Sequence, residues 1–194
     1  MPGLEVAVAK LASAAGIDIV LGTKVPWLSG RGHLDDVVQS DAPASAINAL
    51  AEIHLTLGGD ADLLASKRAG NAPTPDLVHR PSGTIIEVDE VQHSTTARER
   101  SLRLYPGDAV TAFDLDRYLD LVSTWRAKGD AAFAHKTAKD FPAPGGRQAQ
   151  RAYNDSLRDL LAPTFTGHPV IRVAVPDRSL AGVADRLLAH LPSV

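Results

Sequence analysis

Residues 85–93 read Ile-Ile-Glu-Val-Asp-Glu-Val-Gln-His, and this stretch decides the fold. Side chains alternate between the two faces of a β-strand, so Ile86 and Val88 point to one face. Glu87 and Asp89 share the other face, where their spacing places the two carboxylates about 6–7 Å apart. The pattern therefore predicts a strand with one apolar face and one acidic face.

The flanking sequence predicts the other elements. Arg80-Pro81-Ser82-Gly83 has the proline and glycine of a hairpin connection, which joins strands at 76–79 and 84–91. Hydrophobic periodicity and capping residues predict helices at 4–15, 43–57, 98–104, 114–127, 148–161 (ended by Pro163) and 180–191, a strand at 170–175, and at 62–66 either a short strand or the end of a helix. This order predicts an α/β fold with a small mixed β-sheet flanked by helices.

Length and composition fit one globular domain spanning residues 1–194, since 44% of the residues are hydrophobic and 22% are charged. No stretch is long and apolar enough for a membrane helix, and the N-terminus lacks the pattern of a signal peptide, so we expect a cytoplasmic protein without a membrane partner. The absence of cysteine excludes disulfides, thiolate zinc sites and a cysteine nucleophile.

The formal net charge of −3 excludes a protein that coats nucleic acid with a uniformly basic surface. It does not exclude an enzyme that acts on nucleic acid, because an acidic metal site lowers the total charge while arginines gather beside it. Arg147, Arg151 and Arg158 recur at intervals of four and seven along the predicted helix, which places them on one face.

The acidic face of the strand has two interpretations. If it lies inside the protein, two buried like charges require neutralisation, and a divalent cation supplies it. Asp76, at the start of the neighbouring strand, is then the natural third carboxylate, and the chemistry is metal-assisted hydrolysis. In the alternative, Glu87 and Asp89 lie on the solvent face of an edge strand, where such alternation is common.

The order of elements and the acidic residues resemble the PD-(D/E)XK nuclease superfamily. Pro75-Asp76 resembles the first half of the signature and Glu87-Val88-Asp89 the second, and the pattern I-E-V-D-x-x-x-H at 86–93 is similar to the branch of short-patch-repair endonucleases. The resemblance implies a restriction-endonuclease-like αβββαβ core formed by 43–93 and 148–191, with an N-terminal extension (1–42) and a helical insertion after the third strand (94–147).

The resemblance also implies a function. It predicts a metal-dependent endonuclease that hydrolyses phosphodiester bonds in DNA, with RNA as the alternative substrate, and a homodimer as a candidate assembly. The implied site consists of Asp76, Glu87 and Asp89 as ligands of Mg²⁺ or Mn²⁺, Gln92 and His93 to place water or substrate, Glu52 as an additional acid, and Lys67, Arg147 and Arg151 to contact phosphate.

One departure from the family leaves alternatives open. Asp89 stands where the family has the lysine that orients or activates the attacking water. A catalytically inactive nuclease fold that binds nucleic acid or a protein partner is therefore a second interpretation. A small-molecule hydrolase that uses carboxylates and a metal is a third.

Overall fold

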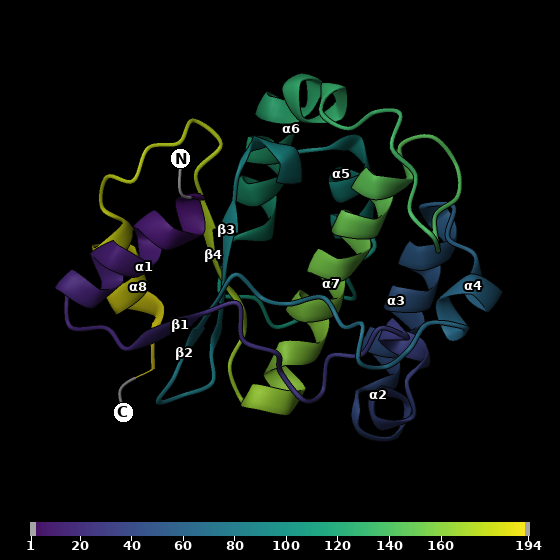
Figure 1. Ribbon diagram of the computed structural model, residues 1–194, viewed down its shortest axis with the longest axis horizontal. Helices are drawn as coiled ribbons and strands as arrows, with labels where there is room; N and C mark the ends of the chain where they lie inside the picture. The colour runs from purple at the N-terminus through teal and green to yellow at the C-terminus, as the bar shows by residue number, and fades with distance from the viewer. Residues whose placement is uncertain (1–2, 193–194) are drawn as a thin grey trace.

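The computed structural model describes residues 3–192, in which a four-stranded mixed sheet lies between two layers of helices (Figure 1). The strands, in their order across the sheet, are β1 (Ile19–Leu21), β2 (Leu77–His79), β3 (Ile85–Asp89) and β4 (Ile171–Ala174). β1 and β3 are both antiparallel to β2, whereas β4 runs parallel to β3. The predicted α/β class with a small mixed sheet is confirmed.

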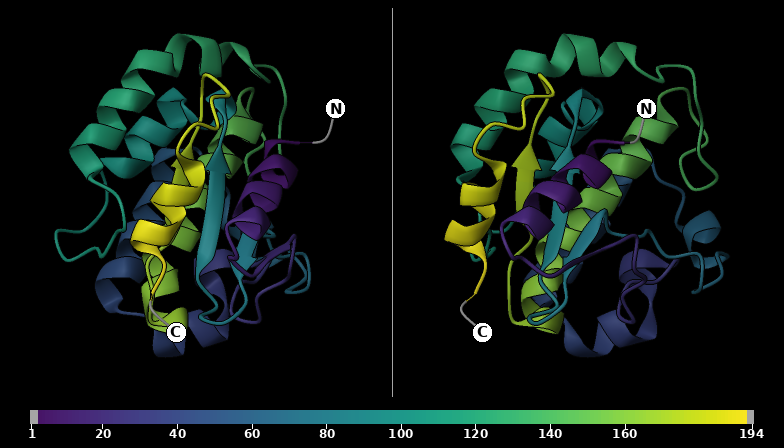
Figure 2. Two further views of the ribbon diagram at one scale, coloured as in Figure 1. Left: turned by 90° about the vertical axis from the view of Figure 1, so that its left-hand side faces the viewer. Right: turned by 60° about the vertical axis from the view of Figure 1, so that its left-hand side comes forward.

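The helices are unevenly divided between the two faces of the sheet. They are α1 (Leu4–Ala14), α2 (Asp36–Asp41), α3 (Ala44–Thr56), α4 (Ala61–Ala65), α5 (Thr96–Leu102), α6 (Leu115–Ala131), α7 (Gly146–Thr166) and α8 (Val183–His190). α1 and α8 cover one face, and α7 crosses the other with α3 and α5 packed against it (Figures 1 and 2). None of the helices within residues 3–192 combines the length and the apolar character that a membrane span requires.

β3 is a central strand with two different faces, as its sequence predicts. Ile86 and Val88 belong to the apolar cluster that joins the sheet to α1 and α8. Glu87 and Asp89 face α7 and are only 2% and 3% exposed. The interpretation of β3 as an edge strand with a wet acidic face is therefore wrong, because β2 and β4 flank it and α7 covers its acidic face.

The hairpin between β2 and β3 also forms as predicted, since Leu77 pairs with Ile86 and Val78 with Ile85. Gly83 takes a φ of 71°, the left-handed conformation that glycine adopts without a steric cost.

α7 extends beyond Pro163, which is a correction to the predicted end at that residue. A proline inside a helix removes one backbone hydrogen bond, so packing must offset the loss. Phe165 provides such packing, because its ring stacks on Trp27 with the ring centroids 5.3 Å apart. The helix ends instead at Thr166 and is capped by Gly167, whose φ of 75° is left-handed.

Of the two alternatives for residues 62–66, the end of a helix is confirmed and the strand is wrong: most of these residues belong to α4, whose first turn is capped by the Asp60 carboxylate accepting the Leu63 N–H at 2.9 Å. The prediction for residues 1–42 needs correction. The additional strand is β1, which lies within 1–42, so this segment is part of the sheet rather than an extension outside the core. β1 has only three residues, too few to show a period of two in the sequence.

Gly129 provides a test of how α6 packs. A methyl group at this position would overlap the carbonyl oxygen of Ser94, which follows β3, whereas a methyl group at Gly107 would meet no atom within 4 Å. We expect Gly129→Ala to destabilise the protein by about 1–3 kcal/mol, despite the higher helix propensity of alanine. Urea unfolding measures the effect, with Gly107→Ala as the matched control. Equal stability of the two variants would contradict the close contact.

Candidate active site

A polar cleft of about 400 Å³ opens between α7 and the chain that leads into β2 and β3. In Figure 1 the segment after α4 crosses in front of α7 on its way to β2. Most of the residues expected at the site line this cleft, namely Lys67, Asp76, Glu87, Gln92, His93, Arg147 and Arg151. The fold thus brings together acids and cations that the sequence places in separate segments.

Asp76 lies immediately before β2, and its side chain is held across the hairpin. Its Oδ2 accepts a hydrogen bond from the backbone N–H of Val88 at 2.9 Å. Burial raises the pKa of Asp76 above its ordinary value, although the Val88 N–H and the nearby charges of His93 and Arg158 act in the opposite direction. Asp76 is therefore fixed beside β3 in an environment that disfavours an unpaired negative charge.

Glu87 is the most perturbed acid of the cleft. Burial raises its pKa to about 8, with Arg158 opposing the shift and Asp76 adding to it. Arg158 Nε lies 2.8 Å from Glu87 Oε1, but the two groups are not aligned for a hydrogen bond. Oε1 thus has no hydrogen-bond partner within residues 3–192, a costly state for a buried oxygen that a bound cation or proton would relieve.

Asp89 does not line the cleft, although it shares a face of β3 with Glu87. It accepts a hydrogen bond from the Tyr118 hydroxyl at 2.6 Å and another from Arg172 Nη1 at 2.8 Å. Its carboxylate is therefore neutralised inside the protein by an arginine and a tyrosine, rather than placed beside Asp76 to hold a metal ion.

His93 joins the cleft from the short 3-10 helix Val91–His93 that follows β3. Its Nδ1 lies 2.9 Å from Asp155 Oδ2 and 3.4 Å from Asp89 Oδ1. Burial lowers the pKa of His93, but the two carboxylates outweigh it and raise the pKa above its ordinary value. The two carboxylates therefore favour the charged form of His93 and hold its ring at Nδ1 in the cleft.

The cations expected to contact phosphate differ in their surroundings. Lys67 is already paired, with Nζ 2.7 Å from the buried carboxylate of Asp140. Arg147 is exposed, and its guanidinium group donates to the side-chain oxygen of its helix neighbour Gln150. Arg151 donates to the backbone oxygen of Gln92 at 3.3 Å. Of the expected cations, Arg147 and Arg151 are thus best placed to meet an anion.

Glu52 does not belong to the cleft. It lies on the exposed side of α3 and is absent from the residues that line the site. The predicted additional acid is therefore not brought to Asp76 and Glu87.

Behind the cleft lies a buried ionic network between α7 and the sheet. Arg172 of β4 contacts Asp159 at 2.9 Å as well as Asp89 at 2.8 Å. Arg98 of α5 also contacts Asp159, at 2.7 Å. Arg158 contacts Asp155 at 2.8 Å in addition to Glu87. Carboxylates and guanidinium groups thus neutralise one another in a region where isolated charges would be strongly unfavourable.

Sequence reasoning missed most of this network. The spacing places Arg158 on one helix face with Arg147 and Arg151 but does not reveal its burial: Arg158 is 5% exposed and lines the cleft beside Glu87. A signal was present at Arg172, which interrupts the apolar run at 170–175. A charge in the middle of an apolar strand predicts a buried partner of opposite sign.

Two of the three carboxylates expected at a metal site, those of Asp76 and Glu87, line the cleft. Within residues 3–192, no group of three or more His, Asp or Glu side chains is arranged to hold a metal ion. Asp76 and Glu87 remain as two oxygen donors on one cleft. Mg²⁺ commonly binds through one or two carboxylates and takes its other ligands from water and substrate phosphate, so the type and number of these donors are compatible with such an ion.

Comparisons with protein-family models, with curated proteins and with solved structures return no match to this chain. The resemblance to PD-(D/E)XK nucleases therefore stays a prediction, supported only by the residues that carry it and by their arrangement in the cleft.

Arg172 tests whether the buried network stabilises the fold. Replacement by methionine leaves Asp89 and Asp159 without their shared guanidinium group, and we expect a loss of about 3–5 kcal/mol in the free energy of unfolding. Arg103→Met is the control, because Arg103 is 62% exposed and pairs with Glu99 on the surface, a contact worth less than about 1 kcal/mol. Urea unfolding at pH 7 compares the variants. Similar losses of unfolding free energy in Arg172→Met and Arg103→Met would show that the stability of the fold does not depend on the buried network.

The raised pKa of Glu87 predicts that the stability of the metal-free protein depends on pH. Its pKa rises from 4.5 to about 8 on folding, so between these values the folded state binds more protons than the unfolded state. Stability therefore falls as the pH rises from about 4.5 to 8. The raised pKa of His93 acts in the same direction, since its contribution is lost as the pH rises above 6.5 and through the folded-state value.

We expect Glu87→Gln to remove much of this decline, so that the variant gains stability relative to the wild type as the pH rises. Urea midpoints measured from pH 5 to 8.5 in the presence of EDTA provide the measurement. The slope left in the variant belongs to the other groups with shifted pKa values, which include His93 and Asp76 (raised) and His33, His54 and His79 (lowered). If the urea midpoints of the wild type and of Glu87→Gln changed with pH in parallel, the raised pKa of Glu87 would be contradicted.

Proposed function

We propose that this chain is a divalent-metal-dependent nuclease of the PD-(D/E)XK type, which hydrolyses phosphodiester bonds in DNA rather than RNA. The observation that carries the proposal is the shared cleft of Asp76 and Glu87, the two acids of the signature that the sequence resembles. The element order α1, β1, β2, β3, α7, β4 supports it, because it follows the αβββαβ order of that core. In this arrangement α1 is the first helix of the core, and α2, α3 and α4 lie between β1 and β2.

Each group of the cleft has a role in this reaction. Asp76 and Glu87 hold Mg²⁺ or Mn²⁺, which lowers the pKa of bound water and stabilises charge on a phosphoryl oxygen. Arg147 and Arg151 bind the phosphates of the substrate, since a guanidinium group matches the geometry of a phosphate. His93, held at Nδ1 by Asp155, presents Nε2 as a donor to a phosphate oxygen or a leaving group.

Arg158 takes the place of the cation that the family carries on the third strand. Asp89 cannot supply that charge and is itself neutralised by Arg172. Arg158 reaches Glu87 from α7 instead and lines the cleft. A guanidinium group beside the carboxylates stabilises negative charge on phosphate, but its high pKa makes it a poor proton acceptor at neutral pH. Activation of water therefore depends on the metal ion.

The contact between Arg158 and Glu87 also favours a second function, which is binding of nucleic acid without cleavage. The ion pair of Arg158 with Glu87 neutralises the carboxylate without a metal ion. A chain that keeps this pair permanently closed would bind nucleic acid through Arg147 and Arg151 without cleaving it. This is the catalytically inactive binding module, and it differs from the nuclease in requiring no divalent cation.

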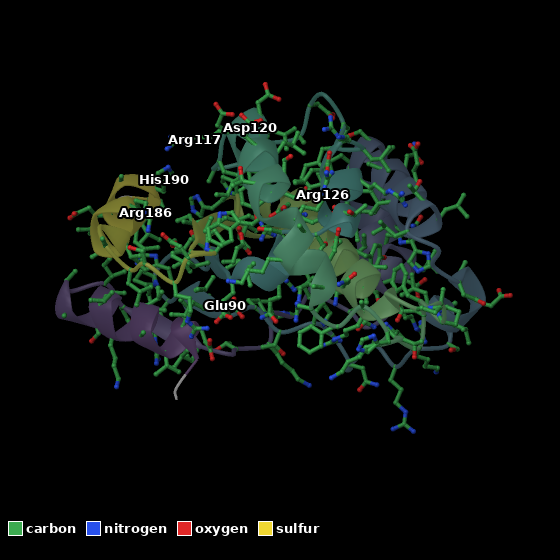
Figure 3. All side chains as sticks on the ribbon, turned by 90° about the horizontal axis from the view of Figure 1, so that it is seen from above. Glu90, Arg117, Asp120, Arg126, Arg186 and His190 are labelled. Carbon is green, nitrogen blue, oxygen red and sulfur yellow. The ribbon has the colours of Figure 1, made fainter. Side chains whose placement is uncertain are left out.

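Substitution of the two acids tests the proposed reaction. We expect Glu87→Gln and Asp76→Asn each to reduce Mg²⁺- or Mn²⁺-dependent cleavage of DNA oligonucleotides by about 100-fold or more, because each removes a metal ligand. Glu90→Gln is the matched control: Glu90 follows β3 directly, does not line the cleft, and is labelled in the view from above in Figure 3. We expect this control to cleave within about twofold of the wild type.

Calorimetric titration with Mn²⁺ separates the two functions. Heat of binding that disappears in Glu87→Gln supports the metal site. Wild-type protein that binds oligonucleotides in EDTA, shows no Mn²⁺ binding and cleaves neither DNA nor RNA would be the binding module, and the nuclease proposal would be rejected. Circular dichroism of each variant establishes that its fold is intact.

A further inference from the structure

Phe133 has an unusual backbone conformation for its residue type. It lies in the segment between α6 and α7, and its φ of 62° is in the left-handed region. Bulky side chains rarely adopt this conformation, which is unfavourable for every residue except glycine and, to a lesser degree, asparagine and aspartate. Most of the positive φ values in the described chain belong to glycines. Strain of this kind persists where the surroundings impose it, and it concentrates at functional sites.

Burial does not account for this strain. Phe133 is 37% exposed and belongs to none of the hydrophobic clusters formed by the described residues. An apolar ring left in contact with water contributes little to folding. A smaller polar residue or a glycine would serve the turn better, so the local structure does not explain the presence of an aromatic ring.

The neighbours of Phe133 are cations. Lys136 Nζ lies 4.7 Å from the centroid of the ring, and the guanidinium carbon of Arg151 lies 5.8 Å from it. Arg151 also lines the cleft, and the segment that carries Phe133 is joined to the start of α7 by the Arg147 N–H, which donates to the Lys136 oxygen at 3.0 Å. The ring is not itself among the residues that line the cleft, but it lies next to Arg151, which does line it and is expected to bind phosphate.

An exposed aromatic ring flanked by cations has the chemistry that binds unpaired nucleotides. A nucleobase stacks on an aromatic face, and the adjacent phosphate pairs with lysine or arginine. In a duplex the faces of the bases are already covered by their neighbours, so a ring on the surface reaches them only where a nucleotide is unpaired.

We propose that Phe133 is a stacking platform for one unpaired nucleobase, and that the cleft therefore prefers single-stranded DNA or a single-stranded overhang. The proposal rests on the proposed function and adds the class of substrate to it. The base stacks on Phe133, its phosphate meets Arg151, and the strand continues toward Asp76 and Glu87. Phe133 contacts the substrate but takes no part in the cleavage step.

The test measures binding without cleavage, by fluorescence anisotropy of a labelled 12-nucleotide oligo(dT) and of a 12-base-pair duplex in EDTA. Phe133→Leu keeps an apolar side chain and the strained backbone but removes the aromatic face. We expect it to weaken binding of the single strand at least about fivefold and to leave duplex binding within about twofold of the wild type. Leu188→Ala is the control, since Leu188 is an exposed apolar residue on α8, which covers the other face of the sheet.

Phe133→Trp supplies a second measurement that does not depend on affinity. Tryptophan restores the stacking surface, so we expect oligo(dT) binding close to that of the wild type and quenching of the new fluorescence when a base stacks on it. The wild type, which contains Trp27 and Trp125, provides the background signal.

The possible outcomes separate the two proposals. Equal oligo(dT) affinity for the wild type and Phe133→Leu, or no additional quenching in Phe133→Trp, would overturn the stacking platform while metal-dependent cleavage left the nuclease standing. Tighter binding of the duplex than of the single strand by the wild type would overturn the substrate preference. No binding of either oligonucleotide by the wild type would overturn this proposal, and absence of cleavage as well would overturn the proposed function.

Discussion

The guanidinium group of Arg172 is the interaction on which the site depends. It is fully buried in β4, and it pairs with Asp89 of the neighbouring strand and with Asp159 of α7. Burying a charge is costly unless partners are fixed at short distance, so these contacts constrain where α7 can lie on the sheet. The same helix carries Arg151 and Arg158, which form one wall of the cleft. Folding and the geometry of the site are therefore linked through one buried ion.

The two faces of the sheet are packed by different kinds of interaction, and only the face toward α7 borders the cleft. The face toward α1 and α8 is apolar, and its stability comes from non-directional burial that tolerates small shifts. The face toward α7 is ionic, and each of its contacts depends on direction and distance. Asp89 and Asp159 are satisfied deep in this network, whereas Glu87 stands at its border with the cleft and keeps one oxygen without a hydrogen bond among the described residues. A ligand that binds the unsatisfied carboxylate of Glu87 would gain more binding free energy than one that binds a carboxylate already paired in the network.

Local sequence patterns correctly predicted the features that depend on neighbouring residues alone. The alternation in 85–89 assigned both faces of β3, and the proline and glycine of 80–83 predicted the hairpin. Asp89 could not be assigned this way, because its partner Arg172 becomes its neighbour only through the parallel pairing of β3 with β4. The end of α7 was likewise wrong, since the stacking of Phe165 on Trp27 lies outside any local pattern.

Spacing along a strand establishes that two carboxylates share a face, but it does not establish that they share a partner. Glu87 and Asp89 lie on the same side of β3, yet one meets Arg158 at the cleft and the other meets Arg172 and Tyr118 behind it. The two carboxylates have different partners because different elements lie beside them. α7 supplies the partner of Glu87, whereas β4 and α6 supply the partners of Asp89. Two acids two residues apart on a strand therefore need not share one site, and the second carboxylate of the cleft comes from Asp76, which lies immediately before β2.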